Sequence, residues 1–120
     1  MKPMIGVWIV VAAASSLAGC AAAGDQAAVE LVRGDYRAVS DCGYSRLSRH
    51  YGGLRRENMD QIAVREVHYD VGSDHSGYVG FEAVGHGRTR VEYRAKAGGR
   101  DGLWNVPQLQ ADLAGCSGRR

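Results

Sequence analysis

Histidine and aspartate side chains gather between residues 68 and 86 and are the strongest candidates for metal binding or acid–base chemistry. The set consists of His68, Asp70, Asp74, His75 and His86. Imidazole nitrogens and carboxylate oxygens are zinc ligands, and a site needs three or four of them to converge. His68 and Asp70 would share one face of a strand. We expect the loop that holds His75 and the turn that holds His86 to lie at opposite ends of a hairpin meander, so we favour solvated polar residues over a metal site.

Two weaker patterns were weighed in the same way. The segment Asp70-Val-Gly-Ser-Asp74 is similar to the start of a calcium loop, but it lacks the later acidic ligands, and ordinary turn chemistry explains its residues. Ser45, Ser48 and His50 are close in sequence, but no sharp Gly-x-Ser-x-Gly turn surrounds any serine. We therefore assign no catalytic residue, no metal ligand and no cofactor.

A row of basic side chains marks the stretch 88–96. The row consists of Arg88, Arg90, Arg94 and Lys96. Glu92 interrupts it, and the alternation with apolar or small residues predicts a strand with one face in water. Three tyrosines, also favoured in binding sites, lie in the same predicted sheet: Tyr69, Tyr78 and Tyr93. We interpret the row as a candidate binding face for an acidic partner; the alternative is a solvated face that deters edge pairing.

The first 20 residues carry the clearest motif in the chain. One positive charge at Lys2 precedes an apolar run that extends from Met4 to Leu17, as in a secretory signal. The run closes with Leu17-Ala18-Gly19-Cys20, which resembles the lipobox of bacterial lipoproteins. The resemblance covers only these residues. It implies that a dedicated signal peptidase cuts before Cys20 and that Cys20 then carries lipid.

The lipobox resemblance implies a division of the chain into three parts. Residues 1–19 would be the signal peptide, 20–34 a lipidated N-terminus and tether, and 35–120 a small soluble domain. Two or three acyl chains would hold the protein stably, because each buried methylene contributes about 0.8 kcal/mol. In organisms that resemble the enteric bacteria, an Asp directly after the lipidated cysteine favours the inner membrane, so the Ala21 found here favours the outer membrane. Two alternatives stay open: ordinary secretion with cleavage in the Ala-rich segment after Cys20, and an uncleaved membrane helix in the uncharged stretch after Lys2.

The other two cysteines form an even pair. Once Cys20 is acylated, Cys42 and Cys116 remain in an oxidising compartment, and we predict that they form a disulfide. Closing a loop of this length corresponds to roughly 4 kcal/mol in the chain-entropy description. Two free buried thiols are the alternative. A redox pair is disfavoured because there is no Cys-x-x-Cys motif.

Hydrophobic periodicity predicts two helices. Asp35 can cap a helix that begins at Tyr36, carries apolar residues at spacings of three and four, and stops at Gly52-Gly53. Asn105 can cap a second helix over about 107–115. Its apolar stripe consists of Val106, Leu109, Leu113 and Cys116.

Three strands are predicted between the helices, over 62–71, 78–84 and 88–97. In the first strand the apolar phase changes at Arg65-Glu66, and we expect a β-bulge there. The polar segment 54–60 is expected to be a connection, and 29–34 stays open between strand, helix and tether. The predicted fold is therefore α+β: a three-stranded antiparallel sheet with the N-terminal and C-terminal helices on one face, in the order αβββα, joined by the disulfide.

Composition and size narrow the function. Removing residues 1–19 removes one of the 15 basic residues and none of the 13 acidic ones, so no strong field remains and nucleic-acid binding is not indicated. We expect a non-catalytic interaction or structural component of the envelope, attached through Cys20 and facing the periplasm. Its partner would be an envelope protein, glycan or lipid. The alternative is a metal-binding or hydrolytic domain that uses His68 and Asp70.

Overall fold

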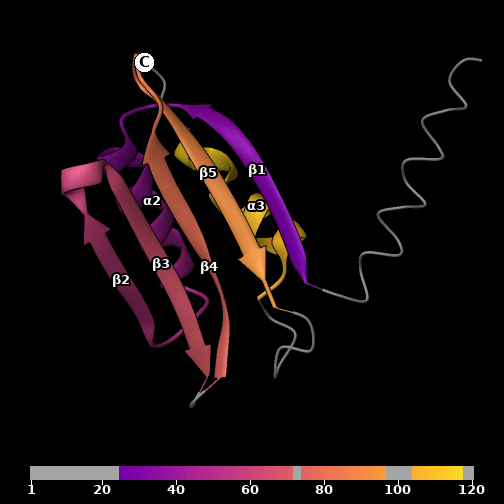
Figure 1. Cartoon of the computed structure of the whole chain (residues 1–120). Helices are drawn as coiled ribbons and strands as arrows, with labels where there is room; N and C mark the ends of the chain where they lie inside the picture. The colour runs from indigo at the N-terminus through magenta and orange to yellow at the C-terminus, as the bar shows by residue number, and fades with distance from the viewer. Residues whose placement is uncertain (1–24, 72–73, 97–103, 118–120) are drawn as a thin grey trace, which may run out of the picture.

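The computed structural model describes residues 25–71, 74–96 and 104–117, which form a five-stranded antiparallel sheet and two short helices (Figure 1). The strands are β1 (Gln26–Arg33), β2 (Leu54–Met59), β3 (Val64–Val71), β4 (Asp74–Ala83) and β5 (Arg88–Ala95). The helices are α2 (Tyr36–Leu47) and α3 (Val106–Leu113), with 3-10 turns η2 (Asp60–Ile62) and η3 (Ala114–Cys116). The order across the sheet is β1-β5-β4-β3-β2. The predicted three-stranded αβββα fold is therefore wrong.

The two strands that were missed are the edges of the sheet. The segment predicted as a polar connection contains β2, whose Leu54 pairs with Tyr69 and whose Met59 pairs with Val64. The N-terminal segment left open between strand, helix and tether lies mostly in β1, which pairs with β5 along its whole length. An edge strand pairs on one side only, and its burial is too weak to give a clear alternation of apolar residues. Both segments become strands because their backbones pair with residues elsewhere in the sequence.

The predicted bulge at Arg65-Glu66 is also wrong. Ile62 lies in η2, and the strand begins only at Val64, after Ala63 in the left-handed conformation at φ 55°. Val64 then lies on the same side of β3 as Glu66 and His68, opposite to the buried Val67, and the described ladder places its register shift between Tyr69 and Asp70 instead. The shift of apolar phase in the sequence therefore arises because Ile62 lies in a turn and Val64 lies on the side of the sheet opposite to Val67, and the observed irregularity comes later in the strand.

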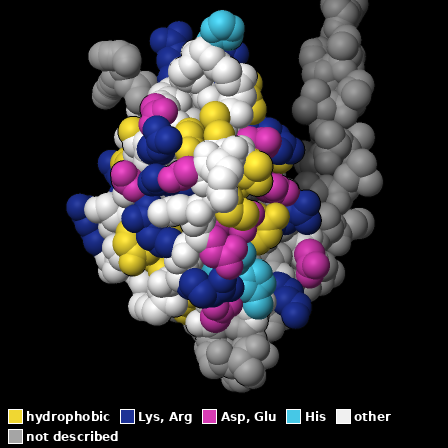
Figure 2. Space-filling model, turned by 60° about the vertical axis from the view of Figure 1, so that its left-hand side comes forward, with side chains coloured by type: hydrophobic (Ala, Val, Ile, Leu, Met, Phe, Trp, Pro, Cys, Tyr) yellow, Lys and Arg dark blue, Asp and Glu magenta, His cyan; other side chains and the backbone are white. Residues whose placement is uncertain are grey.

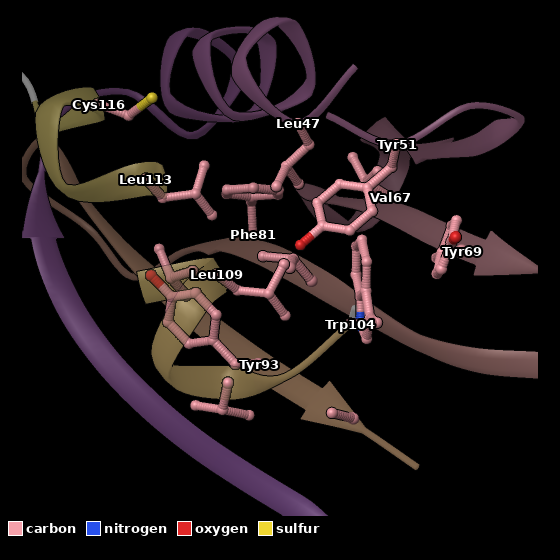
Figure 3. Packing of buried hydrophobic residues seen from close by; sticks show 14 of the residues in the cluster. Leu47, Tyr51, Val67, Tyr69, Phe81, Tyr93, Trp104, Leu109, Leu113 and Cys116 are labelled. Carbon is pink, nitrogen blue, oxygen red and sulfur yellow. The ribbon is translucent and has the colours of Figure 1, made fainter. Parts of the chain in front are cut away.

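Both helices pack on the same face of the sheet, α2 behind β3 and β4 and α3 behind β5 and β1 (Figure 1). Their predicted caps are confirmed: the Asp35 carboxylate accepts hydrogen bonds from two backbone N–H groups at the start of α2, and the Asn105 side chain accepts one at the start of α3. The covered face forms the core shown in Figure 3. Its fully buried members include Leu47, Val67, Val79, Phe81 and Leu109. The inward positions predicted for β5 are confirmed, since Thr89, Val91, Tyr93 and Ala95 are all buried.

Gly43 sets how closely α2 approaches the rest of the core. A Cβ at this position would lie 2.9 Å from Leu113 Cδ2 and 2.9 Å from Phe81 Cζ. A glycine inside a helix costs roughly 1 kcal/mol of helix propensity relative to alanine. Here the missing side chain lets the helix, the sheet and α3 meet at one point.

The predicted pairing of Cys42 with Cys116 is present, with 74 residues of sequence separation. Cys42 lies in α2, and Cys116 lies in η3, the 3-10 turn that follows α3. The bond thus ties α2 to the end of η3 rather than to α3 itself. A loop of this length corresponds to about 4 kcal/mol of lost unfolded-state entropy, a large share of a small domain's stability.

An ion pair fixes the start of β3 to the start of α2. Arg65 holds both carboxylate oxygens of Asp60, with Nε donating to Oδ1 at 2.9 Å and Nη2 donating to Oδ2 at 3.0 Å. The Tyr36 hydroxyl also donates to Asp60 Oδ1 at 3.0 Å. These hydrogen bonds, led by those from Arg65, lower the pKa of Asp60 from 3.8 to about 2.

This lowered pKa predicts a specific loss of stability in acid. A carboxylate whose pKa is depressed by folding stabilises the protein above its unfolded pKa and loses that contribution as the pH falls through the folded value. The free energy of unfolding should therefore fall between about pH 4 and pH 2, and Asp60→Asn should remove that part of the fall. Urea denaturation at a series of pH values measures it. Arg65→Gln should flatten the same interval, and an Asp60→Asn profile parallel to the wild type would show that the pair does not control it.

Candidate functional site

The face of the sheet that points away from the helices carries charged and aromatic side chains. Strand pairing places residues of all five strands on it, because directly opposite residues share a face. Its charged members include Arg55, Glu57, Glu66, Glu82, Arg88, Arg90, Glu92 and Arg94. Figure 2 shows basic and acidic side chains interleaved over the molecule, with histidine beside them near the lower end. We refer to the face of the sheet that points away from the helices as the outer face.

The candidate binding row of arginines lies on the outer face, but acidic neighbours offset part of its charge. Arg90 Nη1 lies 3.2 Å from Glu82 Oε1, and Arg94 Nε donates to Glu92 Oε2 at 2.9 Å. Arg88 stands opposite Arg33 of β1, and Lys96 is exposed just beyond the end of β5. The row is thus a surface of mixed charge rather than a continuous positive stripe.

Of the three tyrosines considered with that row, only Tyr78 lies on the outer face. Tyr69 and Tyr93 are buried in the core beneath the helices. Desolvation raises the pKa of the Tyr78 hydroxyl, and the nearby Glu92 carboxylate adds to the rise. A hollow of about 320 Å³ opens beside this tyrosine. It is lined by Asp25, Gln26, His75, Gly77, Tyr78, Arg94, Ala95 and Lys96.

Next to the hollow, two histidines face each other. His68 Nδ1 lies 3.0 Å from His75 Nε2, although the residues belong to different strands. The other ring nitrogen of His68, Nε2, lies 2.8 Å from Glu66 Oε1 and 3.8 Å from Glu57 Oε1. The His68 side chain is only 11% exposed, whereas that of His75 is 44% exposed. A nearly buried imidazole thus has a more exposed imidazole at one nitrogen and carboxylates at the other.

Neighbouring side chains restrain both the ring and the carboxylates of this cluster. The Tyr78 ring covers His68, with 5.3 Å between centroids and 36° between planes. Arg55 Nε donates to Asp70 Oδ2 at 3.2 Å, and Arg55 also pairs with Glu57. Asp70 Oδ1 lies 4.0 Å from His75 Nε2. The cluster therefore combines nitrogen and oxygen ligands for a cation with a cationic side chain that orients the oxygens.

A β-bulge is what brings His75 to the outer face. Tyr69 pairs with Gly77 but Asp70 pairs with His75, so Ser76 is an extra residue in the ladder. Residues two apart share a face, so without the bulge His75 would point toward the helices with Gly77 and Val79. One extra residue reverses that parity and places His75 beside His68.

The candidate metal ligands named from the sequence do not all lie together in the structure. It brings together His68, Asp70 and His75, while His86 lies in the turn at the opposite end of the sheet, as expected. Asp74 opens β4, but its side chain lies outside the described part, as does most of the segment 70–74 that was compared with a calcium loop and explained by turn chemistry. Sequence reasoning missed Glu57, because its strand was assigned to a connection, and Glu66, because the bulge was placed beside it. A strand assignment for 54–59 would have found Glu57, and a regular strand through Arg65 and Glu66 would have placed Glu66 on the same face as His68.

The serines considered as nucleophiles have ordinary structural roles where they are described. Ser48 Oγ donates to the carbonyl oxygen of Ser45 at 3.0 Å, at the end of α2. His50 Nε2 lies 3.9 Å from an oxygen of Asp112 in α3. These contacts join a helix end to its own last turn and to the second helix, so they do not form a nucleophile–base pair.

The bulge also depends on a glycine, which gives a test. Gly77 has φ +148°, and a Cβ there would lie 2.1 Å from the Arg94 carbonyl oxygen and 2.7 Å from Trp104 Nε1. We expect Gly77→Ala to lower the free energy of unfolding by at least about 2 kcal/mol, because strain adds to a collision with backbone. Gly53→Ala, at φ +70° with open space around it, should cost about 1 kcal/mol. Urea denaturation compares the two, and equal losses would show that the close approach is not needed.

Comparisons with known protein families, with curated protein sequences and with solved structures found no match for this chain. Among the described residues, no helix is both long enough and apolar enough to cross a membrane. What the chain does must therefore be inferred from its own residues and their geometry.

Proposed function

We propose that this protein is a lipid-anchored, non-catalytic component of the bacterial cell envelope and that its outer face binds another envelope protein. The observation that carries the proposal is the combination of the lipobox-like Leu17-Ala18-Gly19-Cys20 with a sheet that, in the described residues, is covered by helices on one side only. The first feature gives the attachment, and the second leaves a broad, ordered surface open on the other side.

The position of β1 brings the domain close to the proposed anchor. Strand β1 begins at Gln26, six residues after Cys20. A chain of that length spans at most about 20 Å even when fully extended. The lipidated residue would therefore hold the sheet within a short distance of the membrane, so that any partner would be met at the same envelope surface.

The charge pattern favours a protein over a polyanionic glycan or lipid surface. A polyanion is attracted by a field of unpaired cations, whereas Arg90, Arg94 and Arg55 each contact a carboxylate on this face. A surface of interleaved charges suits a partner protein with a complementary charge pattern. Complementary charge pairs across an interface fix the orientation of the two proteins and disfavour binding of other partners. Arg and Tyr are also the side chains that protein interfaces favour. Tyr78 and the hollow beside it would lie within this contact.

Replacement of the proposed lipid attachment residue tests the anchor. Cys20→Ser should abolish thioether formation, because a hydroxyl is not a soft nucleophile, and the protein should no longer be processed before residue 20 or retain lipid. Membrane fractionation and intact mass measure both outcomes. The double variant Cys42→Ser with Cys116→Ser removes two thiols outside the motif and should still be anchored. Normal processing and full membrane retention of Cys20→Ser would refute the proposed anchor.

Site-specific photo-crosslinking tests the outer face as the binding surface. Leu31 is 56% exposed and stands opposite Arg90, so a benzophenone amino acid at Leu31 should trap the partner in cells. Arg90→Glu with Arg94→Glu should abolish that product, since both positions would repel acidic groups on the partner. Arg37→Glu with Arg49→Glu makes the same charge change on the helical side and should leave it intact. A product that survives the first pair would exclude this face.

A further inference from the structure

The contacts of His68 favour one tautomer of its ring. An ionised Glu66 can only accept a hydrogen bond, so the 2.8 Å contact between His68 Nε2 and Glu66 Oε1 suits the tautomer with the proton on Nε2. A neutral His68 then presents the lone pair of Nδ1 to His75 Nε2 at 3.0 Å. Two ring nitrogens 3.0 Å apart would repel each other through their lone pairs unless a shared proton or a metal ion lies between them.

The spacing of the two nitrogens is close to that of two ligands on one metal ion. Zinc–imidazole bonds of 2.0–2.1 Å at a tetrahedral angle separate the nitrogens by about 3.3–3.4 Å. The present separation is 3.0 Å, so a shift of a few tenths of an ångström suffices. His75, with a side chain 44% exposed, is free enough of packing to make that shift, while the His68 ring is held under Tyr78.

Glu66 and Arg55 occupy the places of supporting groups in metal sites. A metal-bound histidine typically donates its second ring N–H to a carboxylate, which fixes the tautomer and raises ligand basicity. Glu66 holds His68 in this way. Ligating carboxylates are themselves held by hydrogen bonds, and Arg55 donates to Asp70 Oδ2, which leaves Oδ1 turned toward His75 Nε2 at 4.0 Å.

We propose that His68 Nδ1, His75 Nε2 and a carboxylate oxygen of Asp70 bind a divalent first-row transition-metal ion such as zinc, with Glu66 positioning His68. Two imidazoles and one carboxylate are a donor set that these ions favour, and water completes the coordination. The carboxylates of Asp70, Glu57 and Glu66 lie in the cluster around the two imidazoles with the guanidinium of Arg55, while Arg94 and Lys96 line the hollow on the other side of His75, so the attraction for a dication comes from the carboxylate side. When the metal binds, the proton on His75 Nε2 leaves for solvent or for its Nδ1.

A second arrangement of ligands shares His68 and is weaker. Ligand atoms of Glu57, Glu66 and His68 lie within 4.8 Å of one another. An ion there would need His68 Nε2 to lose the proton that it donates to Glu66, and it would have a single nitrogen ligand. The site between the two imidazoles keeps the contact of His68 Nε2 with Glu66 and adds a second nitrogen ligand.

Zinc titration of the full chain, purified in detergent without a polyhistidine tag and stripped with a chelator, tests the site. Isothermal titration calorimetry should show one zinc per chain. His75→Gln should weaken binding more than Glu66→Gln, which removes a supporting group and should weaken it about tenfold. Asp70→Asn should also weaken binding. His86→Asn is the matched control, because it removes an exposed imidazole at the other end of the sheet and asparagine tolerates its φ of 49°.

Long-range ¹H–¹⁵N spectra of the imidazoles identify the bound nitrogens. Zinc should shift His68 Nδ1 and His75 Nε2 and leave the proton on His68 Nε2. Absence of stoichiometric zinc binding by the wild type would overturn the proposal, as would binding that His75→Gln leaves unchanged. A loss of affinity in Glu57→Gln together with a shift of His68 Nε2 would place the ion in the other arrangement and would likewise overturn it. Circular dichroism of each variant shows that the fold is intact, and neither result depends on the lipid anchor.

Discussion

Packing of two helices against one side of the sheet is the constraint on which the rest of this structure depends. Gly43 lets α2 approach until Phe81 and Leu113 fill the space where its side chain would be. The Cys42–Cys116 bond then ties this helix to the turn after α3. In the described part of the chain both helices lie on one side of the sheet, and the other side remains a continuous surface. The outer face and the histidine cluster take their positions from that asymmetry.

The outer face gains its chemistry from cross-strand neighbours rather than from any one strand. His68 of β3 meets His75 of β4, and Glu57 of β2 stands opposite Glu66 of β3. The same pairing sets Arg90 of β5 against Glu82 of β4 and reduces the positive charge of the arginine row. Local charge counts along a strand therefore misjudge this surface, since each side chain has partners on two neighbouring strands.

The bulge near the β3–β4 hairpin links the fold to the candidate site. Gly77 permits it, because no side chain fits between the Arg94 carbonyl and Trp104, and Trp104 Nε1 donates to that same carbonyl at 2.9 Å. The extra residue, Ser76, then turns His75 outward. A packing requirement in the core thus places an imidazole on the opposite face of the sheet.

The sequence by itself determined the features that depend on neighbours a few residues away: the Asp35 and Asn105 caps, the helical stripes, the alternation of β5 and the pairing of the last two cysteines. It also supplies the lipobox-like motif, which stays a prediction. Only the tertiary structure decided the edge strands β1 and β2, because their hydrogen bonds reach strands elsewhere in the chain and their own side chains alternate weakly. It likewise decided the meeting of His68 with His75, because the face on which a strand residue lies depends on every register shift between it and its partner.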